Sequence, residues 1–91
     1  MIKNFRHPDP GPIALSGVPE TAEQVGWLRE QGIGAVVSLH PVAPGVAEAL
    51  RAAGVAHLDF PVRDFSEPLP GELADLARFI RERAAGGVLI H

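Results

Sequence analysis

The chain has 91 residues, 46% of them hydrophobic, which suits one small packed domain and is too apolar for a disordered chain. It contains no cysteine, which excludes a disulfide framework and a thiolate metal site within these residues and favours a reducing compartment. A net charge of −3 without a basic stripe argues against nucleic-acid binding, and no apolar run approaches the roughly 18 residues that cross a bilayer, so we expect a cytoplasmic protein without a membrane partner.

The first third of the chain predicts an arm, a strand and a helix. Residues 1–11 are polar and rich in proline, which is typical of an extended arm. Pro12 to Leu15 is a short strand candidate that closes on a turn. Pro19 suits the first turn of the helix that follows, where its missing N–H costs nothing, and Gly32 can end that helix in the left-handed conformation.

The middle of the chain repeats this order. Ile33 to Leu39 is a strand whose apolar residues do not alternate with polar ones, as expected for a central strand covered on both faces. A helix over Gly45 to Ala53 follows. Val55 to Phe60 alternates, which predicts a strand near the edge of the sheet with one wetter face, on which His57 is a surface residue.

The third helix has the clearest pattern in the sequence, because its leucines and isoleucine recur at helical spacing. The residues of this stripe are Leu69, Leu73, Leu76 and Ile80. A glycine pair ends the helix, and Val88 to Ile90 then forms a strand too apolar for an exposed tail, which predicts a central position. His91 follows this strand.

Helices that alternate with apolar strands predict an α/β fold with three layers, in which a mostly parallel central sheet is flanked by helices. No linker interrupts the chain between Pro12 and His91, so we expect a single domain. Function in such a sheet collects in the loops beyond the carboxyl ends of the strands. We therefore expect that the loop following Val88 to Ile90, which would carry the mechanism, is not part of this chain.

Residues 60–68 connect the third strand to the third helix on this functional side, and they hold an acid and an aromatic between prolines. Asp64 could be a turn or helix-capping residue, but Ser66 is better placed as the cap, so a catalytic role competes with a structural one. Phe65 could form a wall of a substrate pocket or could fix the loop to the core.

The four histidines, His7, His40, His57 and His91, have no ligand spacing such as H-E-x-x-H, and we predict neither a metal nor a cofactor. A lone histidine at the end of an apolar strand is more often a buried residue with a backbone partner than a catalytic group. The residues alone therefore favour a structural role for His91.

The order PIALSG, helix, VVSL, VAHLDFPVRDF, amphipathic helix and VLIH resembles the amino-terminal part of the cysteine-dependent protein tyrosine and dual-specificity phosphatases, from about Pro12 to His91. In that family a strand reading V-x-[VI]-H leads directly into a Cys-x5-Arg loop, so the resemblance implies that His91 precedes the nucleophile. Tyrosine-specific members commonly have Trp-Pro-Asp where this chain has Val62-Arg63-Asp64, which is closer to the dual-specificity type.

The resemblance implies that residues 1–91 are the amino-terminal part of one phosphatase-like domain, which hydrolyses phosphomonoesters through a cysteinyl-phosphate intermediate. The substrate would be a phosphorylated protein or a small phosphomonoester. Asp64 would be the general acid that protonates the leaving oxygen, and Phe65 and His91 would support the substrate pocket. Without the nucleophile and the phosphate-binding loop, the 91 residues alone are expected to be inactive.

Two other functions stay open. The first is a non-catalytic module of the same fold that recognises phosphorylated partners. The second is an unrelated α/β domain, such as a rhodanese-like sulfur carrier or a small metal-dependent hydrolase. The residues that follow the last strand would distinguish these, because a cysteine six positions before an arginine supports catalysis, whereas serine or glycine in its place supports binding.

Overall fold

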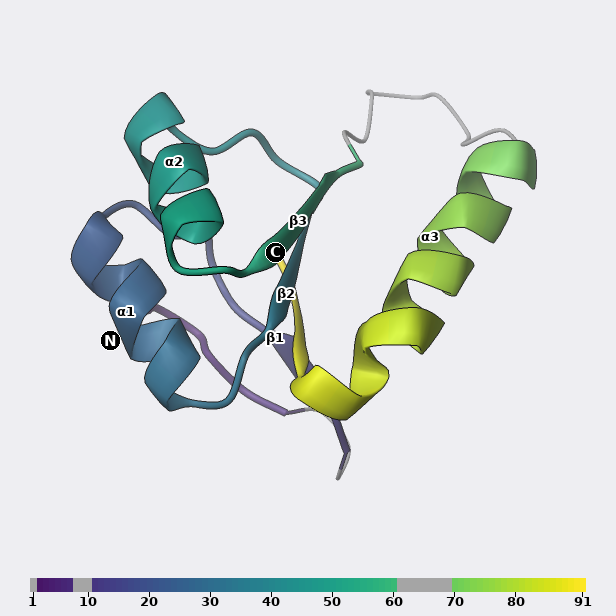
Figure 1. Cartoon of the computed structure of the whole chain (residues 1–91), viewed down its shortest axis with the longest axis horizontal. Coiled ribbons are helices and arrows are strands. Elements are labelled where there is room, and N and C mark those ends of the chain that lie inside the picture. The colour runs from purple at the N-terminus through teal and green to yellow at the C-terminus, as the bar shows by residue number, and fades with distance from the viewer. Residues whose placement is uncertain (1, 8–10, 61–69) are drawn as a thin grey trace.

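A four-stranded sheet runs through the middle of the molecule, with helices on both of its faces (Figure 1). The computed structural model describes residues 2–7, 11–60 and 70–91. All neighbouring strands are parallel, which confirms the α/β fold with a central sheet between helices. In chain order the elements are β1 (Ile13–Leu15), α1 (Ala22–Glu30), β2 (Ala35–Ser38), α2 (Pro44–Ala52), β3 (Ala56–Asp59), α3 (Pro70–Arg83), the 3₁₀ helix η1 (Ala84–Gly86) and β4 (Val88–Ile90).

The strand order is β1-β4-β2-β3, so the last strand of the chain lies between the first and the second. β4 and β2 occupy the interior of the sheet, as predicted from their uninterrupted apolar sequences, and β3 lies at an edge, as predicted from its alternation. Because the strands are parallel, the carboxyl ends of β4, β2 and β3 are neighbours along one edge of the sheet.

Helices α1 and α2 cover one face of the sheet (Figure 1). Ala14, Leu89 and Val36 share one rung across three strands and are fully buried on this face. Burial of each large apolar side chain here contributes about 1.5–3 kcal/mol to folding. The helix residues that complete this core are Val25 and Leu28 of α1 and Val46 and Leu50 of α2.

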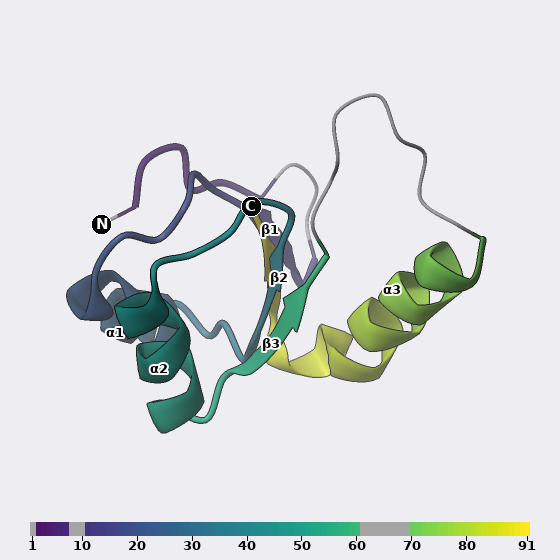
Figure 2. The same cartoon turned by 90° about the horizontal axis from the view of Figure 1, so that it is seen from above.

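Helix α3 covers the opposite face less completely. It packs three partly buried residues from its middle and last turns, Leu76, Phe79 and Ile80, against the sheet, and it contains no fully buried residue. Figures 1 and 2 show the helix leaning away from the sheet toward its first turn. The prediction that Leu73 lies on the buried stripe is wrong, because Leu73 precedes the turns that contact the sheet and is 49% exposed. Leu69 lies outside the described residues.

Helix α1 begins later than the sequence predicted. Thr21 is its N-cap, and the Thr21 hydroxyl accepts a hydrogen bond from the backbone N–H of Gln24 at 3.2 Å. This bond satisfies one of the backbone N–H groups that the first turn leaves without a partner. A proline has no side-chain oxygen and could not cap the helix in this way. Pro19 is instead buried in the segment before the helix.

The start of β4 is set by a close crossing of two backbone segments. Gly87 has φ +78°, and a Cβ at this position would lie 2.4 Å from the carbonyl oxygen of Gly32. The carbonyl of Gly87 accepts hydrogen bonds from the N–H groups of Gly34 and Ala35 at 3.0 and 3.1 Å. This contact fixes the register of β4 against β2, and it therefore determines which residues meet at the carboxyl edge.

Residues 2–7 form an arm along the outer side of β1. Arg6 and Leu15 exchange two backbone hydrogen bonds of 2.8 Å, and Gly17 donates to the carbonyl of Lys3 at 2.8 Å. Ile2 is buried against the core beneath α1 and α2. The arm therefore pairs with part of an edge strand whose polar groups would otherwise be open to association.

Candidate active site at the carboxyl edge of the sheet

Polar side chains gather where β2, β3 and β4 end. Ser38 is the last residue of β2, Asp59 is the last residue of β3, and His91 directly follows β4. His91 continues the parallel ladder, because its N–H donates to the carbonyl of Val37 at 3.1 Å and its carbonyl accepts from Leu39 at 2.8 Å. This is the edge at which α/β sheets carry their chemistry.

Alternation along the strands determines which face these side chains occupy. Val36 pairs with His57 in the sheet register, and Val36 points toward α1 and α2. Ser38 lies two residues beyond Val36, and His91 lies two residues beyond the buried Leu89, so their side chains share this face.

Ser38 is the centre of the polar cluster. Its Oγ lies 2.7 Å from Nε2 of His57 and 2.7 Å from Nε2 of His91. Ser38 is 1% exposed and His91 is 7% exposed, so these bonds are shielded from water. Asp59 adds a carboxylate oxygen 3.5 Å from Nε2 of His57.

The prediction that His57 is a surface residue is wrong. Its side chain is 16% exposed and is hydrogen-bonded to Ser38. The alternating pattern of β3 correctly marked an edge strand, but His57 faces the side of the sheet covered by α1 and α2 rather than solvent, because the hydroxyl of Ser38 on the neighbouring strand compensates its burial.

His91 is buried, as the residues alone favoured, but its side-chain partner is a serine hydroxyl rather than a backbone group. Its Nδ1 atom is also buried and has no hydrogen-bond partner within the described part of the chain. Burial lowers the pKa of His91 below its ordinary value of 6.5, electrostatic interaction with the neighbouring His57 and His40 lowers it further, and Asp59 partly opposes this. The imidazole is therefore mainly neutral near neutral pH.

The cluster contains the residue types of a hydrolytic triad but not its geometry. In a Ser-His-Asp triad the carboxylate binds Nδ1 of the histidine and the serine faces Nε2. Here the serine and the carboxylate of Asp59 both approach the same Nε2 atom of His57. Ser38 is also enclosed rather than presented to a substrate. Its hydroxyl links two imidazoles and does not have the surroundings of a nucleophile.

The structure places one of the three predicted site residues. His91 lies in the cluster, whereas Asp64 and Phe65 lie outside the described residues. Sequence reasoning did not select Ser38 or His57. The available signal was a polar residue at the end of a buried strand, which usually needs a partner when it is enclosed.

Two further properties concern residues 2–7, 11–60 and 70–91. No group of three or more histidine, cysteine, aspartate or glutamate side chains in these ranges is arranged to hold a metal ion. No helix in these ranges is long and apolar enough to cross a membrane.

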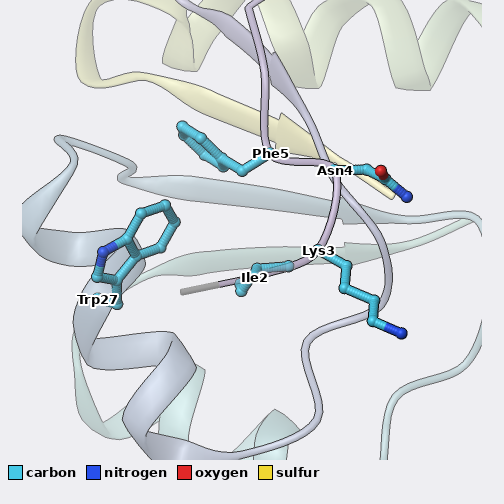
Figure 3. Close-up of a pocket in the computed structure, with 5 residues that line it drawn as sticks. All are labelled: Ile2, Lys3, Asn4, Phe5 and Trp27. Carbon is cyan, nitrogen blue, oxygen red and sulfur yellow. The ribbon is translucent and has the colours of Figure 1, made fainter.

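A pocket of about 320 Å³ lies apart from the cluster, between the amino-terminal arm and α1 (Figure 3). Phe5 and Trp27 meet edge to face in its wall, with ring centroids 4.9 Å apart. None of the cluster residues lines it. The lining residues are Ile2, Lys3, Asn4, Phe5 and Trp27.

Comparison with known proteins gives matches among solved structures alone, since no family model and no curated protein matches the chain. A "putative phosphatase (DUF442)" from Shewanella putrefaciens CN-32 superposes with a TM-score of 0.78 at 22% identity, covering 99% of this chain and 59% of that one. Tk-PTP in its active form superposes with a TM-score of 0.76 at 27% identity, covering 100% of this chain and 63% of that one.

This chain therefore spans less than two thirds of the length of either protein. A mutant form of Tk-PTP matches similarly, at 28% identity with a TM-score of 0.73 over 96% of this chain. The four parallel strands and their flanking helices thus form the α/β fold of these two proteins.

Proposed function

We propose that this chain is the amino-terminal part of a phosphatase domain that hydrolyses phosphomonoesters through a cysteinyl-phosphate intermediate. The observation that carries the proposal is the position of His91, buried at the carboxyl end of the central strand β4, in a fold shared with Tk-PTP, a protein tyrosine phosphatase. The substrate we propose is a phosphorylated protein or a small phosphomonoester. A protein substrate carries its phosphate on tyrosine alone, or on tyrosine and on serine or threonine.

The location suits phosphoryl transfer for electrostatic reasons. A loop that follows a central parallel strand and begins a helix presents backbone N–H groups and the positive end of the helix dipole to an anion. A cysteine in such a loop ionises more readily and becomes a nucleophile near neutral pH. In this proposal the cysteine, the loop and an arginine that binds the phosphate oxygens all belong to a segment beyond His91.

Asp64 is the proposed general acid. A phenolic leaving group has a pKa of about 10, so its departure from phosphorus is slow unless a proton reaches the bridging oxygen. Phe60 is anchored at the carboxyl edge of the sheet, because its N–H donates to the carbonyl of Ser38 at 2.8 Å. The four Cα-to-Cα steps from Phe60 to Asp64 span at most roughly 14 Å, so the length of the chain limits how far Asp64 can lie from this edge. Phe65 is proposed to contact the substrate next to Asp64.

The test is the substitution Asp64→Asn in the full-length protein, assayed with aryl phosphates whose leaving groups differ in pKa. A general acid predicts a loss in kcat of roughly 100-fold or more, largest for the poorest leaving groups. The matched control is Asp75→Asn, which removes an exposed carboxylate of α3 that pairs with Arg78 and should leave kcat unchanged. A small loss of equal size for all substrates would overturn the assignment of Asp64.

A further outcome would overturn the catalytic proposal itself. If the full-length protein binds a phosphotyrosine peptide but does not hydrolyse it or any aryl phosphate, the chain belongs to a phosphate-recognition module. A titration by calorimetry beside a phosphate-release assay distinguishes these outcomes.

A further inference from the structure

In the cluster at the carboxyl edge, the hydroxyl group of Ser38 is shared by two histidine rings. Two imidazole nitrogens, Nε2 of His57 and Nε2 of His91, each lie 2.7 Å from the Oγ of Ser38. A hydroxyl has one proton to donate and can accept from other donors, whereas each nitrogen of a neutral imidazole either donates or accepts. Within these two contacts alone, the hydroxyl proton is used when one histidine donates to Ser38 and Ser38 donates to the other.

Asp59 determines the direction of this chain of hydrogen bonds. Its carboxylate lies 3.5 Å from the same Nε2 atom of His57 that contacts Ser38. An ionised carboxylate attracts a nitrogen that carries a proton and repels a lone pair. This attraction favours a proton on Nε2 of His57, which then donates to Ser38, while the Ser38 hydroxyl donates to Nε2 of His91.

This direction determines whether Nδ1, the other ring nitrogen of His91, carries a proton. A neutral imidazole that accepts at Nε2 carries its proton on Nδ1. The lowered pKa of His91, caused first by burial and then by electrostatic interaction with His57 and His40, is consistent with a neutral ring. Nδ1 is buried without a partner among the described residues, so this arrangement creates an enclosed N–H donor beside the end of β4.

We propose that Ser38 and His57 are positioning residues that form a hydrogen-bond relay and hold the proton of His91 on Nδ1. The relay presents this N–H to a hydrogen-bond acceptor at the carboxyl edge of the sheet. An acceptor of suitable chemistry is a backbone carbonyl or a thiolate of the segment that follows β4. The proton assignment rests on the geometry of the cluster, and the identity of the acceptor rests on the proposed phosphatase function.

The direct test is NMR of the full-length protein with ¹⁵N-labelled histidine, recorded at neutral pH with long-range ¹H–¹⁵N correlations of the imidazole rings. We expect His91 to be neutral with its proton on Nδ1 and His57 to carry a proton on Nε2. A proton on Nε2 of His91, or a doubly protonated His91 ring at neutral pH, would overturn the relay without any variant.

Substitutions then test the role of each member. Ser38→Ala removes the link, and we expect the ¹⁵N shifts of His91 to move toward the Nε2–H tautomer, whereas Ser38→Thr keeps a hydroxyl and should preserve the wild-type pattern. His57→Phe removes the donor from the edge strand and should act like Ser38→Ala. His40→Gln is the control, because His40 is exposed and outside the hydrogen-bonded chain. An unchanged His91 tautomer in both Ser38→Ala and His57→Phe would contradict the proposal.

The NMR spectra test the relay and the phosphatase assay tests the proposed function, so the two can fail separately. A full-length protein without phosphatase activity that shows the expected tautomers would overturn the function and leave the relay in place. An active phosphatase with the proton on Nε2 of His91 would do the reverse.

Discussion

His91 places an ionisable ring where a positive charge is poorly solvated. The ring is 7% exposed, and its neighbours include two further histidines and one carboxylate. Desolvation is the largest of these influences, and it favours the neutral form because an imidazolium loses more hydration energy on burial than a neutral imidazole does. The protonation state of this one residue is therefore coupled to the stability of the fold.

We predict that the full-length protein loses stability as the pH falls below about 6.5, in part because of His91. The folded-state pKa of His91 is depressed, so the unfolded chain takes up the proton first as the pH falls. The contribution is complete above the unfolded pKa and is lost as the pH falls toward the folded pKa. Urea unfolding across this range should show a shallower dependence in His91→Asn, whereas His7→Gln, at an exposed histidine, should match the wild type. Equal slopes for His91→Asn and the wild type would contradict this.

At the scale of elements, the junction of η1 with β4 holds the site in place. Gly87 brings its backbone against the turn between α1 and β2, and this close contact sets which residue of β4 pairs with Val36. A side chain cannot be accommodated there by a rotamer change, because the obstructing atom is a backbone oxygen. The position of His91 opposite Ser38 thus depends on a glycine about one strand length away.

Gly87→Ala is expected to destabilise the protein by at least about 1–3 kcal/mol, because it combines a positive φ with a steric clash. The matched control is Gly26→Ala in α1, where a Cβ meets nothing within 4 Å. Alanine there should stabilise the helix by roughly 0.5–1 kcal/mol. Urea midpoints of the two variants check this, and a Gly87→Ala protein as stable as the wild type would show that the crossing is not constrained.

Local patterns predicted the elements well, but they did not predict how closely each one packs. The apolar sequences of β2 and β4 indicated interior strands, and both lie there, because a strand covered on both faces has no polar face to show. The stripe of α3 predicted a buried Leu73, which is exposed, because periodicity gives the direction of a face and not the length over which a neighbour covers it.

At the scale of the whole molecule, the sheet separates two unequal cores. Among residues 2–7, 11–60 and 70–91, the core beneath α1 and α2 contains ten buried residues, whereas the core beneath α3 contains three. Leu89 belongs to the larger core, on the strand that also positions His91. The more completely packed side of the sheet is therefore the side on which the Ser38 cluster lies.

Truncation at two leucines measures this asymmetry. Leu89→Ala should cost about 2–5 kcal/mol of unfolding free energy, because it opens a cavity in a fully buried position. Leu73→Ala removes the same atoms from an exposed position of α3 and should change stability by less than about 0.5 kcal/mol. Equal losses in denaturant unfolding would mean that α3 packs more closely than described.

The site was only partly predictable because its members are distant in sequence. The sequence indicated the functional edge of the sheet, since it follows from the ends of the strands, whereas His91 became a site residue only through the family resemblance. Ser38 is 53 residues from His91 and 19 from His57, and the three meet through the register of three strands. No local pattern encodes that register, so Ser38 was not selected and His57 was assigned to the surface.

The most direct measurement is a crystal structure of the full-length protein with orthovanadate, which mimics a phosphoryl group in transfer. The account predicts vanadate bound beyond the carboxyl end of β4, beside His91, with the carboxyl group of Asp64 facing it. Vanadate bound elsewhere, or an Asp64 side chain directed away from the occupied site, would contradict the account.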